Sequence, residues 1–200
     1  MNNVAQKNEE RLHTLLQVMA SQGIENAAAG LSEMIGQHIT VSVPGVSFVP
    51  ISSVPERVGG AEALVVGIYL ACEGEMGGHV MLIMELADAL HLVDLLLGQA
   101  EGLTKEIDSL ARSALAEAGN LTAAYFLNAI AGTLGLQSRP SPPAVIVDMA
   151  GAILDIMLVT AGQISNDILM LEALFRGDDR QLKLYFWMVP DLAPLRAYLA

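Results

Sequence analysis

A carboxylate and an amide lie three residues apart in the stretch SALAEAGN, residues 113–120 of the chain. In a helix, Glu117 and Asn120 would be one turn apart, with Ser113 one turn before them. A carboxylate can pair with a cation, and an amide can donate and accept hydrogen bonds at once. The two could therefore hold a charged partner and orient a water molecule. The alternative is an ordinary solvated helix face, because this spacing often arises by chance.

The helix that must carry these residues is predicted over residues 104–134, with Thr104 as its N-cap and Gly135 just beyond its end. At about 100° per residue, its apolar residues form a predicted buried stripe, and the three polar residues fall about 130° from the centre of that stripe. The predicted stripe consists of Ile107, Leu110, Ala111, Ala114, Ala118, Leu121 and Tyr125.

The outer side of this helix has small neighbours, Ala116, Ala123 and Ala124, in place of the long charged side chains of a typical solvated face. Small residues let another backbone come close, so this side is predicted to be a docking surface. Leu127 and Ile130 leave two alternatives open, contact with a partner or burial against a second helix.

The chain reads as two copies of one unit, residues 9–98 and 104–198. Each copy is predicted to hold a long helix, a strand bounded by proline, a hairpin and a short helix. The copies align 99 residues apart, as in 113 − 14 and 143 − 44. At this spacing Ser113 matches Thr14, Glu117 matches Val18, Asn120 matches Ser21, and Pro143 matches Pro44.

Hydrophobic periodicity and the turn residues predict the remaining elements. Helices are expected at 9–36, 86–98, 104–134 and 190–199, and strands at 38–43, 61–72, 77–85, 144–149, 155–162, 167–175 and 182–189. Half of such a chain would leave an open sheet with an uncovered apolar face. We therefore expect one α+β domain over residues 1–200, a pseudo-twofold internal duplication in which a shared β-sheet of about six strands carries two long helices.

The composition is that of a folded, acidic protein. Hydrophobic residues make up 53% of the chain and charged residues 16%, which is enough apolar surface for a sizeable core. The net charge of −12 repels phosphate backbones and anionic lipids, so we expect no nucleic acid partner. The most apolar tract, residues 79–98, is interrupted by charged residues too often to insert into a membrane.

The single cysteine, Cys72, can form no internal disulfide, which favours a reducing compartment. Residues 1–16 lack the apolar segment of a secretory signal, so we expect a cytoplasmic protein. The histidines do not have the spacing of metal ligands, with one another or with Cys72, so we expect no metal site. They are His13, His38, His79 and His91.

The pattern Ser113-x-x-x-Glu117-x-x-Asn120, followed after residues 121–142 by Pro143, resembles the signature of the CheC-type chemotaxis phosphatases, a family that includes CheC, CheX and FliY. The first copy resembles the first repeat of CheC, with GLSEMIG at residues 30–36 and Pro44 at the matching spacing. The resemblance covers about residues 9–198. It implies an α+β fold with pseudo-twofold symmetry.

The resemblance also implies an activity, the hydrolysis of the aspartyl phosphate of a response regulator, typically phosphorylated CheY, which ends the chemotaxis or motility signal. It implies no cofactor of the protein's own, because the regulator supplies Mg²⁺ and a lysine. An acyl phosphate is already activated, so the enzyme chiefly has to place a water in line with the phosphorus. We expect Asn120 to position that water and Glu117 to pair with the lysine. Pro143 would shape the turn beside the helix, and Ser113 would be peripheral.

The first copy departs from the signature, because Val18 replaces the glutamate and Ser21 replaces the asparagine. Val18 cannot pair with a lysine and Ser21 has a shorter reach. We therefore expect the site formed by Thr14, Val18, Ser21 and Pro44 to be degenerate, with one working site in the second copy. The alternative function is a non-catalytic binding module that docks a receiver domain or a CheD-like partner.

Overall fold

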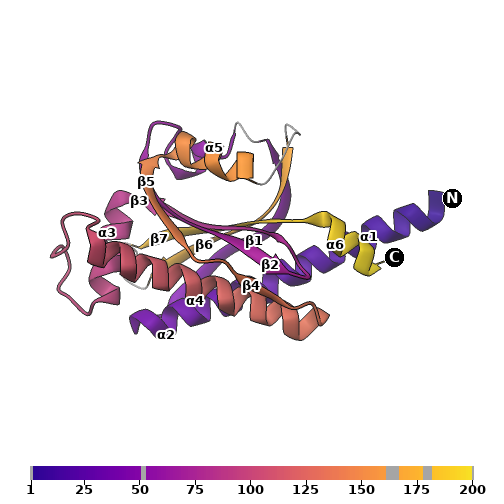
Figure 1. The fold of residues 1–200 in the computed structure, drawn as a ribbon, viewed down its shortest axis with the longest axis horizontal. Coiled ribbons are helices and arrows are strands. Elements are labelled where there is room, and N and C mark those ends of the chain that lie inside the picture. Colours follow the sequence, from indigo (N-terminus) through magenta and orange to yellow (C-terminus); the bar gives the residue numbers. More distant parts are fainter. Residues whose placement is uncertain (1, 51–52, 161–166, 178–181, 200) are drawn as a thin grey trace.

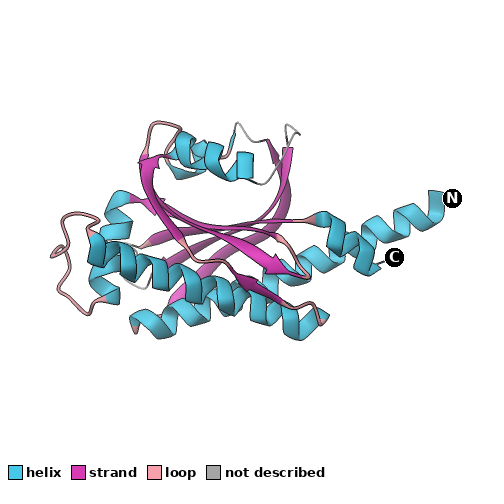
Figure 2. Ribbon diagram, in the orientation of Figure 1, coloured by secondary structure: helices cyan, strands magenta, loops and turns pink. Residues whose placement is uncertain are grey.

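The computed structural model describes residues 2–50, 53–160, 167–177 and 182–199. One antiparallel β-sheet has a thick layer of helices on one face and a short helix on the other (Figures 1 and 2). The strands are β1 (Ile39–Pro50), β2 (Leu64–Gly74), β3 (Gly78–Glu85), β4 (Ser138–Pro140), β5 (Ala144–Met149), β6 (Asp167–Gly177) and β7 (Lys183–Pro190). The helices are α1 (Asn2–Val18), α2 (Ile24–Ile35), α3 (Leu86–Leu96), α4 (Ser109–Leu134), α5 (Ala150–Thr160) and α6 (Leu192–Leu199).

The strands follow the order β1-β6-β7-β3-β2-β4, and β5 also pairs with β2. The first copy contributes β1, β2 and β3, and the second copy contributes the other strands, so both copies share one sheet. The predicted α+β fold with long helices packed on a shared sheet is confirmed. Because β4 and β5 pair with different parts of β2, they lie one after the other along the same edge of the sheet.

The main core lies between the sheet and the layer of α1, α2, α3 and α4 (Figure 1). Its centre is a row of aromatic rings in which Phe126 of α4 contacts Phe186 of β7, with ring centroids 5.1 Å apart, and Phe186 stacks on Phe175 of β6 at 5.8 Å. All three side chains are fully buried. The site helix is therefore anchored to the middle of the sheet, and burial of apolar area supplies the main stabilisation.

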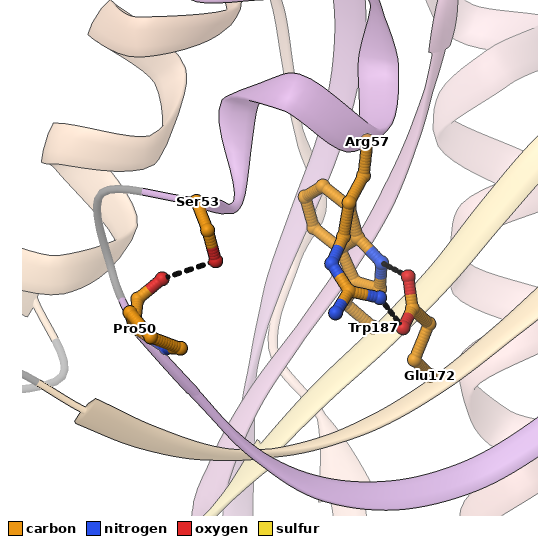
Figure 3. Close-up of polar contacts among 5 residues, drawn as sticks. All are labelled: Pro50, Ser53, Arg57, Glu172 and Trp187. Atoms are coloured by element: carbon orange, nitrogen blue, oxygen red, sulfur yellow. Dashed lines mark hydrogen bonds and ion pairs between the residues drawn. The ribbon is translucent and has the colours of Figure 1, made fainter.

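A second core covers the opposite face of the sheet, under α5 and a 3₁₀ helix at Pro55–Val58. A polar network closes this side (Figure 3). Arg57 of the 3₁₀ helix donates to Glu172 of β6, and the indole Nε1 of Trp187 donates to the other carboxylate oxygen of Glu172 at 3.3 Å. The carboxylate thus satisfies a partly buried guanidinium and a buried indole together.

The two long helical segments bury matching positions. Each buried residue of α4 from Ala111 to Ile130 has a buried counterpart 99 positions earlier, from Leu12 to Leu31. Both segments end at a left-handed glycine, Gly36 and Gly135, with φ of 67° and 70°. In the first segment these buried residues are Leu12, Leu16, Met19, Ala20, Gly23, Ile24, Ala27, Ala28 and Leu31. In α4 they are Ala111, Leu115, Ala118, Gly119, Thr122, Ala123, Phe126, Leu127 and Ile130. The burial therefore follows the spacing read from the sequence.

The first helical segment is longer than predicted. It begins at Asn2 in place of residue 9, and a π-helical turn at Met19–Gly23 joins α1 to α2. Gly23 ends this turn where the segment crosses α4, and a Cβ on it would lie 2.5 Å from the ring of Phe126. The glycine therefore permits the close helix crossing.

The predicted strand at 155–162 was wrong as far as the structure describes it, because residues 150–160 form the helix α5. A short apolar run without alternation does not distinguish a strand from a buried helix. Here the backbone N–H groups of Ala150 and Gly151 donate to the carbonyls of Ala63 and Ala61 at 2.9 and 3.0 Å, which starts the helix above the sheet. Ile153 then becomes fully buried in the second core.

The prediction that the first strand ends at Pro44 was also wrong, because β1 continues to Pro50. Its pairing with β6 shifts register between Ser42 and Gly45, so Pro44 falls in an irregular segment of the ladder. Proline has no N–H to donate, and such an irregularity lets the strand continue without that hydrogen bond.

The site helix begins at Ser109, with Asp108 as its N-cap, so the prediction of Thr104 was wrong. The carboxylate of Asp108 accepts from the N–H of Ala111 at 2.8 Å. Thr104 has another partner, since its N–H donates to the buried carboxylate of Asp94 at 2.8 Å, and the N–H of Gly102 donates to the same carboxylate at 2.7 Å. Asp94 of α3 thus fixes the loop that leads into α4.

Burial by itself would raise the pKa of Asp94, but hydrogen bonds from the side chain and backbone of Thr104 and from the backbone of Gly102 and Leu103 outweigh it. The pKa of Asp94 is therefore held below its usual value, which means that folding favours its ionised form. This contribution to stability is complete above the pKa of the unfolded chain, about 3.9, and is lost as the pH falls through the lower folded pKa.

The Asp94→Asn variant is expected to lose about 1–3 kcal/mol of unfolding free energy at pH 7, because the loop loses its charged acceptor. The difference from the unmodified chain should shrink below about pH 4, where protonation begins to remove the same contribution from Asp94. Urea unfolding across this pH range measures both effects. Asp155→Asn, which changes an exposed carboxylate on α5, is the control. Equal stability of the Asp94 and Asp155 variants at pH 7 would contradict this account.

Candidate functional site

The structure brings the predicted site residues of the second copy to one surface groove of about 610 Å³ between α4 and the β4–β5 edge of the sheet. Figure 1 shows α4 running beside β4. Ser113 and Glu117 are exposed on α4, and Asn120 is half-buried. Pro143 lies on the opposite wall. The groove is lined by Glu73, Ser113, Ala116, Glu117, Asn120, Arg139, Pro140, Ser141, Pro142 and Pro143.

The wall facing α4 is a break in the sheet edge. Pro142 and Pro143 have no N–H groups, so the edge strand cannot pair continuously with β2 between β4 and β5. Ser141 bridges the gap, because its N–H donates to the carbonyl of Ala71 at 2.8 Å and its Oγ accepts from the N–H of Ala71 at 3.0 Å. Pro143 lies in this break, just before β5 on the wall that faces α4, and its role in shaping the turn stays a prediction.

Glu117 and Asn120 are available to a partner. Within the described part of the chain, no group forms a hydrogen bond or ion pair with the side chain of either residue. Ser113 differs, because its hydroxyl donates to the carbonyl of Ser109 at 3.0 Å within α4. An exposed acid and amide without internal partners can bind an external ligand at no cost in internal hydrogen bonds.

The groove also holds an ion pair that the sequence analysis did not identify. Arg139 of β4 lies opposite Glu73 of β2, and its Nε is 3.4 Å from the carboxylate of Glu73. The pairing of β2 with β4 brings them together, and the sequence pattern predicted no strand at residues 138–140. The signal available in the sequence was Arg139 itself, a base at the start of RPSPP.

The buried stripe predicted for α4 was only partly right, because Ala111 and Ala118 are buried but other predicted members are not. Leu110 is 56% exposed and Tyr125 is 37% exposed, whereas Leu115 and Phe126 are fully buried. Leu127 and Ile130 are buried too. Of the two alternatives left open for them, contact with a partner or burial inside the protein, the structure therefore shows burial. The helix is rotated so that Gly119, between Glu117 and Asn120, faces the sheet, where an added Cβ would overlap Cγ2 of Ile68 on β2.

The matching positions of the first copy do not form a second such site. Thr14 and Val18 line a separate groove of about 520 Å³ together with Lys7, Glu10, Arg11, Leu15 and Thr133. The hydroxyl of Ser21 donates to the carbonyl of Gln17 at 3.1 Å. Pro44 belongs to β1, but its side chain lies outside the described part of the structure. Neither Val18 nor Ser21 supplies the acid or the amide found in the second copy.

Other reactive groups do not form a competing centre in the described ranges. Cys72 is buried, and burial raises its pKa to about 12, which keeps the thiol protonated and unreactive at neutral pH. Among the described residues, no group of three or more His, Cys, Asp and Glu side chains is placed to hold a metal ion. Nor does this part of the chain contain a helix with the length and apolarity needed to cross a membrane.

Comparison with known proteins agrees with this geometry. The model of the CheC-like family matches residues 110–147, a span that contains Ser113, Glu117, Asn120 and Pro143. CheY-P phosphatase CheC of Bacillus subtilis (strain 168) is 28% identical over 187 residues, which cover 92% of this chain and 89% of that protein. The resemblance to the CheC-like family is confirmed.

Solved structures share the fold of this chain. FliY of Thermotoga maritima superposes with a TM-score of 0.73 at 17% identity, covering 94% of this chain and 93% of that one. A chain of the CheX–CheY–BeF₃–Mg²⁺ complex from Borrelia burgdorferi superposes with a TM-score of 0.57 at 15% identity, covering 86% and 97%. At these identities the likeness establishes the fold, while the roles of Glu117 and Asn120 stay a prediction.

A methyl group at position 119 is expected to disturb the packing that places the site. Gly119→Ala should destabilise the protein by about 1–3 kcal/mol, because overlap with the buried Ile68 outweighs the better helix propensity of alanine. Gly132→Ala in the same helix is the matched control, since an added Cβ there meets no atom within 4 Å. That variant should gain about 0.5–1 kcal/mol. Thermal and urea unfolding give both values, and a Gly119→Ala variant as stable as Gly132→Ala would refute the tight packing.

Proposed function

We propose that this protein hydrolyses the aspartyl phosphate of a CheY-like response regulator and so ends its signal. The observation that carries the proposal is the pair of Glu117 and Asn120, which line one groove together and whose side chains have no internal partner among the described residues. The relatives support it, because the Bacillus subtilis protein is named a CheY-P phosphatase and one structural relative forms a complex with CheY.

Asn120 is the residue proposed to position the attacking water. An acyl phosphate is a mixed anhydride with an activated phosphoryl group, so its hydrolysis needs a water placed in line with the phosphorus more than it needs a strong base. The amide can accept a hydrogen bond from the water and donate one to a phosphoryl oxygen, and it carries no charge that would repel the phosphoryl group. Its half-buried place against the groove wall restricts its rotamers, which favours one orientation of the water.

Glu117 is proposed to pair with the lysine of the regulator, one helical turn from Asn120. The pair would fix the register in which the regulator docks. Mg²⁺ would be held by the regulator, and the groove would add no metal of its own. Ser113 is peripheral in this scheme, because its hydroxyl is already bonded inside α4, and Pro143 shapes the facing wall.

The second candidate function is docking without hydrolysis, of a receiver domain or of a CheD-like partner. The groove of the first copy favours it, since a hollow of about 520 Å³ persists there although Val18 and Ser21 replace the acid and the amide. That groove, lined by Thr14 and Val18, could hold a partner without the acid and the amide of the second site. Binding that is measurable and turnover that is not would support this alternative.

Purified protein should speed the loss of phosphate from at least one Mg²⁺-bound phosphorylated receiver domain in a panel. Asn120→Ala should lower kcat about 100-fold, because a misplaced water costs that much in a positioning mechanism. Glu117→Ala should raise KM about tenfold or more through the lost charge pair. Phosphate release and single-turnover kinetics measure the two effects separately.

Asn128→Ala is the matched control, because it removes an exposed amide from the same helix outside the groove. This variant should keep the kcat and KM of the unmodified protein. If the Glu117→Ala, Asn120→Ala double variant and the unmodified protein leave every receiver at its intrinsic rate, the proposed activity is wrong.

A further inference from the structure

The charge of the groove is a problem for the substrate class proposed above. The chain carries a net charge of −12, and Glu73 and Glu117 both line the groove. A phosphoryl group is an anion, so two carboxylates on the docking surface oppose its approach. Among the described residues that line this groove, Arg139 is the one cation.

Arg139 is placed to offset the negative charge of Glu73 and Glu117 in the groove. It stands on β4, across the groove from the helix that carries Glu117 and Asn120, and its side chain is 80% exposed. The cross-strand contact with Glu73 joins Nε to the carboxylate, and Glu73 is itself 52% exposed. A guanidinium has further N–H donors on its two terminal nitrogens, and these suit the oxygens of a phosphoryl group.

The contact between Arg139 and Glu73 orients the guanidinium without trapping it. Exposed ion pairs contribute little to stability, because solvent screens them and both side chains lose freedom. Exchange of the Glu73 carboxylate for a phosphoryl oxygen is therefore inexpensive for the protein. The register of β2 with β4, which sets Glu73 opposite Arg139, holds the base of the side chain at the groove in either state.

We infer that Arg139 is a substrate-binding residue that contacts the phosphoryl group of the docked regulator, with Glu73 orienting its guanidinium beforehand. The inference rests on the proposed function and adds to it the group that recognises the phosphorylated state. Arg139 makes the groove prefer the phosphorylated form of the partner over the unmodified form. Glu117 and Asn120 alone, an acid and a neutral amide, offer no positive charge for this distinction.

Binding of a receiver domain with and without beryllium fluoride and Mg²⁺ tests the inference, because beryllium fluoride stands in for the phosphoryl group without being turned over. Arg139→Ala should weaken binding of the beryllium fluoride form about tenfold, the loss of one charge-assisted hydrogen bond. Binding of the unmodified receiver should stay the same. Arg139→Lys should recover part of the loss, since it keeps the charge without the planar fork.

Kinetics supply the second readout. Arg139→Ala should raise KM for the phosphorylated receiver more than it lowers kcat, and it should flatten the dependence of KM on salt. Arg176→Ala is the control, because it removes the same charge from an exposed position on β6, a strand near the edge of the sheet opposite β4. Glu73→Gln keeps an acceptor that can orient the guanidinium and removes one negative charge from the groove, so it should leave binding of the beryllium fluoride form equal or tighter.

Equal weakening of both receiver forms by Arg139→Ala, or no weakening of either, would overturn the inference. The outcome for Asn120→Ala separates this failure from failure of the proposed function. If Asn120→Ala abolishes turnover while Arg139→Ala behaves like Arg176→Ala, the phosphatase activity is supported and the proposed role of Arg139 is wrong. If no variant changes the rate of phosphate loss, the phosphatase assignment falls first.

Discussion

Close packing around α4 is the constraint on which the rest of the site depends. Gly119 rests against Ile68 of β2 without room for a methyl group. On its other side α4 presses aromatic rings onto glycines of the first helical segment, with Phe126 on Gly23 and Tyr125 on Gly30. A helix held between a strand and a second helix cannot rotate or slide by a residue without losing these fits. The direction in which the exposed acid and amide point is therefore set by contacts that neither of them makes.

The internal repeat could be predicted because it is carried by strong signals. Gly36 and Gly135 each end a long helix in the left-handed region, where glycine is favoured, and the buried positions that precede each of them recur at the same spacing. The rotation of α4 could not be predicted, because alanine occurs on every side of it and gives a weak periodic signal. Leu110 was therefore assigned to the core although it is 56% exposed. Tyr125 shows why residue type misleads here, since its hydroxyl reaches solvent and donates to Glu33 at 3.1 Å.

The facing wall of the groove depends on contacts that are remote in sequence. Ser141 pairs with Ala71 through its side chain and its backbone, and Arg139 meets Glu73 only because β4 joins the edge of β2. The proline-rich stretch at residues 139–143 indicates an interruption of regular structure, but it does not indicate that the flanking strands pair with β2. The strand prediction for residues 155–162 was wrong for a related reason. The helix over the described residues starts where Ala150 and Gly151 donate to the carbonyls of Ala63 and Ala61, which are remote in sequence.

The two copies together separate what the fold needs from what the site needs. At the position of Glu117 the first copy has Val18, and at the position of Asn120 it has Ser21, yet the buried residues of the two helical segments still match. The acid and the amide are thus dispensable for packing, and their exposure in the second copy contributes nothing to the core. An open groove also suits a reaction in which the partner brings the activated bond and the metal ion. Under the proposed function, such a site would dock a protein surface and place one water molecule, which a rigid helix beside a broken strand edge can do without a deep pocket.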